Sequence, residues 1–133
     1  MKIYIITLIT FLFTLVAFSQ VRLGSTSEEI KQEFWQEEYD LNEGYTDDDI
    51  NYISLRVDRA SVFYYFNYDK ICFLSMVIPD DQGALNYFVE HYNRQYVIVS
   101  STEWKMYSKN GIAKIKLIYD GEGGYYFMWN NQE

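Results

Sequence analysis

The feature that most limits how this chain can fold is the alternation of apolar and polar side chains from Asn51 onward. Alternation with a period of two predicts β-strands, whose successive side chains point to opposite faces of a sheet. Tyr and Phe, which favour such half-buried surfaces, make up 23 of the 26 aromatic residues. The expected strands span residues 52–57, 61–67, 71–78, 96–100, 102–107, 112–119 and 124–129. In the third of these, Cys72, Leu74, Met76 and Ile78 are expected to share one face.

Two segments between the strands have the periodicity of helices. Ser25 or Thr26 can cap a helix over about 27–37, with a glutamate at capping-box spacing. Asp80 or Asp81 can cap a second helix over about 82–94, in which Leu85, Phe88, Val89 and Tyr92 fall on one side.

The predicted fold is an α+β, two-layer domain spanning residues 21–133. Its sheet is mainly antiparallel, because consecutive strands are joined by turns too short for parallel crossovers. One such turn is the hairpin signal Asn110-Gly111. We expect 6–7 strands and two helices in the order α-β-β-β-α-β-β-β-β. The recurring order of elements in the two halves suggests a pseudo-two-fold duplication.

Residues 1–20 have the organisation of a secretory signal peptide. Lys2 precedes an apolar run from Ile3 to Val16, and Ala17-Phe18-Ser19 fits the small-x-small pattern of a cleavage site. Cleavage near residue 19–20 leaves about 113 residues, enough for one domain. An uncleaved anchor is the main alternative and a core helix a weaker one. The run is short for a membrane-spanning helix. We therefore expect a periplasmic or secreted protein with no stable membrane anchor after cleavage.

The charge balance limits the kinds of partner. The chain has 19 acidic and 11 basic residues, a net charge of −8. An acidic surface repels phosphates and anionic headgroups, which argues against nucleic acid and anionic membranes as partners. Cationic partners remain compatible. The single cysteine cannot form an intramolecular disulfide, so the core must stabilise the fold alone.

The acidic charge is concentrated in the first part of the mature chain. Ten of the 19 acidic residues lie between Glu28 and Asp49, and the polar segment 37–49 is predicted to be a loop. Its run Asp47-Asp48-Asp49 is open to two interpretations: a weak calcium site with Glu43 and the Asn42 carbonyl, or a solvated turn or helix start capped by Thr46. The spacing of a calcium loop is not present.

Neither His91 nor Cys72 carries a catalytic signature. A histidine base needs a nucleophile and an orienting group, and no motif connects His91 to either. Cys72 lies in a predicted apolar strand, whereas a reactive thiol needs exposure and positive surroundings. We therefore predict no catalytic residue, cofactor or metal site.

Five tyrosines are candidates for a binding surface. They are Tyr64, Tyr65, Tyr68, Tyr125 and Tyr126. Tyrosine is favoured at interfaces because its ring supplies contact area and its hydroxyl a polar tip. Core packing is the alternative interpretation. A sheet with helices on one face must cover the other with amphipathic rings, a ligand or a second copy of the chain, so a homodimer is also open.

Short motifs give two resemblances. The motifs that carry the first one are the leader end Phe18-Ser19-Gln20, the helix start Leu23-Gly24-Ser25, Tyr64-Tyr65-Phe66-Asn67 with Cys72, and Glu103-Trp104-Lys105. In these motifs the chain resembles small exported Bacteroidota proteins of unknown function. Separately, Gly24, Thr26 and Ile30 are similar in spacing to the first helix of the SmpA–OmlA type of outer-membrane lipoproteins. That second likeness implies a fold like that of beta-lactamase inhibitor protein and an envelope-assembly role.

The favoured function is a non-enzymatic, exported module that binds a protein or small ligand through an aromatic sheet face. One alternative is a small hydrolase that uses carboxylates of segment 37–49. Another is an inhibitor or immunity-type protein whose acidic surface masks a basic target.

We predict that the leader is removed on export. Intact-mass measurement of the protein recovered from the exported fraction should show the loss of the first 19 or 20 residues. Export is expected because the apolar run and its small-x-small end match a cleavable signal. A mass that includes Met1 would contradict this prediction.

Overall fold

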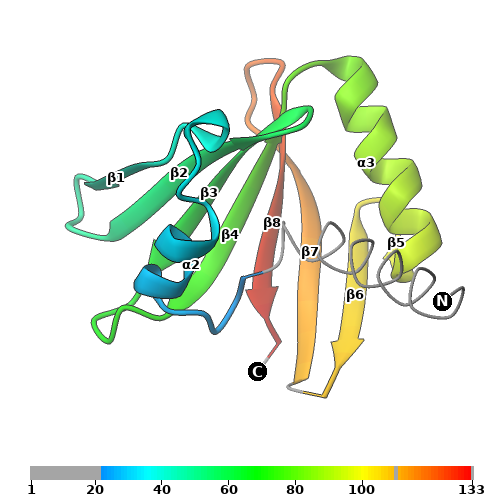
Figure 1. Cartoon of the computed structure of the whole chain (residues 1–133). Helices are drawn as coiled ribbons and strands as arrows, with labels where there is room; N and C mark the ends of the chain where they lie inside the picture. Colours follow the sequence, from blue (N-terminus) through cyan, green and yellow to red (C-terminus); the bar gives the residue numbers. More distant parts are fainter. Residues whose placement is uncertain (1–21, 110, 133) are drawn as a thin grey trace, which may run out of the picture.

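In the computed structural model, the two α-helices of the described residues lie on the same face of the sheet (Figure 1). The structure describes residues 22–109 and 111–132, so the predicted leader at 1–20 and Asn110 of the predicted hairpin lie outside the described residues. The helices are α2 (Ser27–Glu33), the 3-10 helix η1 (Glu37–Tyr39) and α3 (Gln82–Gln95). The strands are β1 (Asn42–Tyr45), β2 (Asn51–Val57), β3 (Ala60–Phe66), β4 (Cys72–Pro79), β5 (Val97–Ser100), β6 (Glu103–Ser108), β7 (Gly111–Tyr119) and β8 (Tyr125–Asn131).

The predicted α+β class is confirmed, but the predicted number and order of strands were wrong. The described residues form one antiparallel sheet of eight strands in the order β1-β2-β3-β4-β8-β7-β6-β5. Each half consists of a helix followed by four strands connected in sequence. The halves meet at the centre, where β4 pairs with β8 from Leu74↔Asn130 to Val77↔Phe127. The strand order is therefore symmetric about this central pair.

The missed strand is β1, which lies within the segment predicted to be a loop. It pairs with β2 from Asn42↔Ser54 to Tyr45↔Asn51 and forms one edge of the sheet. Most of its side chains are exposed, so no apolar alternation marks it in the sequence. The Tyr52 ring lies over Gly44, and a Cβ at this position would be 2.9 Å from the Tyr52 hydroxyl, so a larger residue would displace that side chain.

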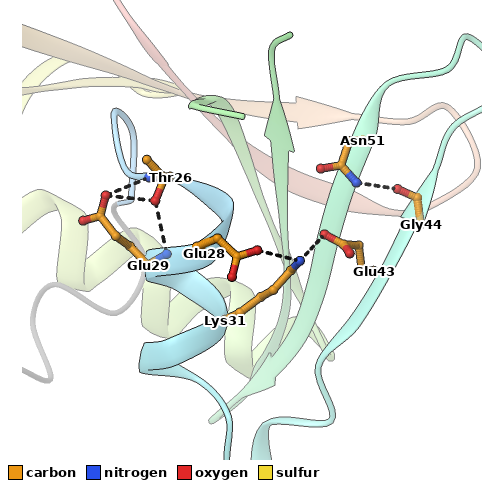
Figure 2. A network of polar contacts seen from close by, with 7 residues as sticks. All are labelled: Thr26, Glu28, Glu29, Lys31, Glu43, Gly44 and Asn51. Atoms are coloured by element: carbon orange, nitrogen blue, oxygen red, sulfur yellow. Dashed lines mark hydrogen bonds and ion pairs between the residues drawn. The ribbon is translucent and has the colours of Figure 1, made fainter. Parts of the chain in front are cut away.

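The helix starts follow the capping signals in the sequence. Thr26 caps α2, and Glu29 completes the capping box by accepting from the Thr26 backbone N–H (Figure 2). Asp81 caps α3 by accepting from the backbone N–H of Ala84 at 2.8 Å. α2 ends four residues earlier than expected, because Phe34 leaves helical geometry at φ −112° and turns its ring into the core.

Both helices contribute aromatic side chains to the core. Phe34, just after α2, stacks on Tyr64 of β3 with ring centres 6.5 Å apart. Tyr92 of α3 is fully buried. Its ring contacts six others, those of Phe88, His91, Tyr96, Trp104, Phe127 and Trp129. Tyr92 therefore attaches α3 to strands β6 and β8.

We predict that Tyr92→Ala lowers the free energy of unfolding by about 3–5 kcal/mol, the usual cost of deleting a fully buried aromatic ring. Urea unfolding followed by fluorescence would measure it. Tyr87→Ala is the matched control, since Tyr87 lies on the same helix but is 42% exposed. Its loss should cost less than about 1 kcal/mol. Equal costs for the two variants would show that Tyr92 does not hold α3 in place.

Candidate functional site

The second face of the sheet is covered by no helix among the described residues. We call it the open face. Cross-strand partners place its side chains in rows, because residues directly opposite each other in a ladder share a face. One row runs Tyr52, Tyr65, Leu74, Asn130, Lys114 and Lys105 across β2, β3, β4, β8, β7 and β6. The next runs Ser54, Phe63, Met76, Met128, Lys116 and Glu103 across the same strands.

The centre of the open face is apolar and aromatic. Tyr52, Phe63 and Tyr65 form a group of rings with centres 5.9–6.4 Å apart. Desolvation, together with the nearby hydroxyls of Tyr52 and Tyr126, raises the pKa of Tyr65 above its usual value. Each of these rings is only half-buried. An antiparallel sheet with one solvated face normally carries polar side chains on it, so this apolar surface is unusual.

A bulge in β4 determines which residues reach the open face. The register between β3 and β4 shifts at Tyr65/Phe66, so that Phe66 pairs with Cys72 and Tyr65 with Leu74. Cys72 therefore points into the core while Leu74 points the other way. The expectation that Cys72 shares a face with Leu74, Met76 and Ile78 was wrong, because it assumed an uninterrupted strand.

The five candidate tyrosines do not form one surface. Tyr65 and Tyr126 both lie on the open face. Tyr64 is fully buried against the helices, so it cannot contact a partner. Tyr68 projects from the β3–β4 turn and is fully exposed. Tyr125 packs against Tyr119 at the end of the β7–β8 hairpin, with ring centres 5.0 Å apart.

Sequence reasoning missed other residues of the open face. These are Tyr52, Phe63, Leu74, Met76, Ile78, Ile118, Met128, Lys105, Lys114 and Lys116. A signal for the lysines was present, since Lys114-Ile115-Lys116 alternates and Ile115 is buried. The pairing of Lys105 in β6 with Lys114 in β7 depends on the register of the two strands, which the sequence does not show.

Segment 37–49 is acidic and mostly exposed, and it joins the first helix to the sheet. Figure 2 shows Lys31 of α2 between the carboxylates of Glu28 and of Glu43 in β1. The Lys31 Nζ lies 3.3 Å from the Glu28 carboxylate and 3.0 Å from that of Glu43. These interactions raise the pKa of Lys31, with the hydrogen bond to Glu43 as the largest cause. Thr46 closes the following turn, its hydroxyl accepting from the backbone N–H of Ile50. Within the described chain, no three His, Cys, Asp or Glu side chains converge as a metal site would require.

Two cavities lie at the ends of the sheet. One, of about 390 Å³, is lined by Tyr45, Asp48, Asp49, Tyr68, Lys70 and Phe73 among others. The other, of about 270 Å³, is lined by residues that include Asp80, Asp81 and Asp120. Its three carboxylates have structural partners. Asp80 pairs with Arg56, which lowers its pKa. Asp81 caps α3, and Asp120 accepts two backbone N–H groups of its turn.

Neither the histidine nor the thiol lines either cavity, and neither lies on the open face. His91 stacks on Tyr87 of the same helix at 6.1 Å, and desolvation followed by the charge of Arg94 lowers its pKa. Cys72 is buried, and this desolvation raises its pKa to about 12. A thiol held in its neutral form is a poor nucleophile.

Comparison with known proteins identifies no relative: no family model, curated protein or solved structure matches this chain. Among residues 22–109 and 111–132, no helix has both the length and the apolar character needed to cross a membrane.

We predict that Cys72 is unreactive in the folded protein. Near neutral pH it should react with a disulfide reagent only on unfolding, because the folded pKa of about 12 keeps it protonated. Its alkylation rate in the native state should keep rising with pH beyond about 9, the ordinary thiol value. Rapid native-state labelling at neutral pH would show that the thiol is accessible and ionised.

Proposed function

We propose that this protein is a non-enzymatic, exported binding module that docks a partner polypeptide on the open face of its sheet. The observation that carries the proposal is the apolar composition of this uncovered face. Half-buried Phe63, Tyr65, Met76 and Met128 lie at its centre. Contiguous apolar surface of this kind marks interaction sites on soluble proteins.

The β4 bulge supports this proposal. An uninterrupted strand would direct Leu74, Met76 and Ile78 toward the helices together with Cys72. Instead, the bulged strand buries Ser75, whose hydroxyl has no hydrogen-bond partner among the described residues. A buried unsatisfied hydroxyl costs about 1–3 kcal/mol. Local arrangements that disfavour stability are expected where function requires them.

The form of the surface favours a polypeptide over a small molecule. Small-ligand sites are concave and enclose most of the ligand, and the two cavities described above lie at the ends of the sheet. The open face spans β2, β3, β4, β8 and β7 without interruption in the pairing. A surface of this extent is suited to a broad contact area.

The carboxylate-dependent hydrolase receives less support. The carboxylates at the smaller cavity act as an ion-pair partner, a helix cap and a turn cap. Most acidic side chains of segment 37–49 are exposed, and only Asp48 and Asp49 line the larger cavity. An exposed acidic edge of this kind is compatible with the inhibitor alternative. The resemblance to SmpA–OmlA lipoproteins and the duplication of the two halves stay predictions, the latter in keeping with the symmetric strand order.

A photocrosslinking experiment in the producing cell would test the proposal. A photoreactive amino acid at Met76, the centre of the open face, should give an adduct with another polypeptide, because its side chain would be covered by the partner. The same group at Tyr87, an exposed position on α3, is the matched control and should give little or none. Denaturing electrophoresis and mass spectrometry would identify the adduct.

The outcomes separate clearly. An adduct at Met76 of twice the chain mass would identify a second copy as the partner. The absence of any polypeptide adduct at Met76, in cells where the variant is folded and exported, would refute the proposed function. Equal labelling from Met76 and Tyr87 would count against the open face as the site.

A further inference from the structure

The open face changes character between β8 and β7. Lys105 of β6 and Lys114 of β7 are direct cross-strand partners on this face, and Lys116 lies two residues along β7. The apolar side chains of β2, β3, β4 and β8 border this basic flank. A surface that has apolar side chains next to lysines favours a partner with matching apolar and anionic groups.

The lysine pair is unfavourable for the isolated protein. Like charges directly opposite each other destabilise a sheet. Lys116 has a carboxylate nearby, Glu103 at 3.8 Å. In the part of the chain that the structure describes, Lys105 and Lys114 form no ion pair. The chain has 19 acidic residues against 11 basic ones, so the lack of an internal counter-charge does not reflect a shortage of carboxylates.

The spacing of the two regions sets a geometric requirement. In one row of the face, Tyr65 and Leu74 are followed by Asn130 and then Lys114. Neighbouring strands lie about 4.8 Å apart, so Leu74 on β4 and Lys114 on β7 are roughly 10 Å apart across β8. A partner that contacts both the apolar centre and the lysines must present an apolar group and an anion at about this separation.

We propose that the partner is a polypeptide segment that places apolar side chains on β3, β4 and β8 and a carboxylate against Lys105 and Lys114. This inference rests on the proposed function and specifies the partner's chemistry. A carboxylate is favoured over a polyphosphate because the net charge of −8 repels a chain of phosphates as a whole. A single carboxylate gains from the local lysine pair without bringing that long-range repulsion.

Selection from a displayed random peptide library tests this. Peptides retained by the exported protein should be enriched in Asp or Glu next to aromatic or aliphatic residues. Lys105→Glu/Lys114→Glu should reduce the affinity of a selected peptide at least about tenfold and shift the selection toward Lys and Arg. Lys105→Gln/Lys114→Gln should weaken binding without that shift.

Lys109→Glu is the matched control, because Lys109 is exposed in the turn after β6 rather than on the face. It should change the affinity less than about twofold if the effect is local. Far-UV circular dichroism and the melting temperature would verify that each variant is folded. Retained affinity in a folded Lys105→Glu/Lys114→Glu protein would overturn the inference.

Other classes of partner give different results. Lysine-dependent binding to an oligothymidine or to phosphatidylglycerol vesicles, without acidic enrichment among the peptides, would replace the polypeptide with a nucleic acid or lipid. An adduct at Met76 in cells combined with neutral or basic selected peptides would overturn the partner chemistry while leaving the proposed function in place. The absence of an adduct at Met76 in cells would remove the proposed function itself, whatever peptides are selected.

Discussion

The coverage of one sheet face by both helices is the constraint on which the other features depend. Eight strands expose two broad faces, and α2 and α3 are both on the same one (Figure 1). On that side, Tyr92 and Phe34 connect the helices to the strands in an aromatic core. The other side receives no such layer within the described chain. Its half-buried rings cover each other only in part, so the fold itself leaves apolar surface accessible to solvent.

Charge is distributed as unevenly as apolar surface. The acidic residues gather around α2, η1 and the β1 edge, where Lys31 joins Glu28 and Glu43 (Figure 2). The lysines of β6 and β7 lie on the opposite half of the sheet and on its open face. The net charge alone is compatible with a cationic partner. Local placement favours an anionic one, because at contact distance the nearest charges dominate over those screened beyond a Debye length.

The sequence predicted those elements whose own side chains produce a periodic signal. The capped helix starts at Thr26 and Asp81 and the alternating strands were found, with boundaries that differ by one or a few residues. β1 was missed because an exposed edge strand needs no apolar alternation. Tyr64 and Tyr65 are indistinguishable by residue type, and only the pairing with β2 and β4 shows that one is core and the other surface. The lysine pair likewise depends on register.

The β4 bulge is a further feature that the sequence pattern did not predict. A period-two reading assigns Leu74, Met76 and Ile78 to the core and Ser75 to solvent, the arrangement that burial energy favours. One extra residue at Phe73 reverses both assignments beyond Cys72. The core then contains an unpaired hydroxyl, while the aliphatic side chains join Phe63 and Tyr65 outside. The hydrophobic effect would oppose this register in an isolated sheet, because the register leaves apolar side chains exposed. A partner that covers the open face would bury these side chains and so stabilise the bulged register.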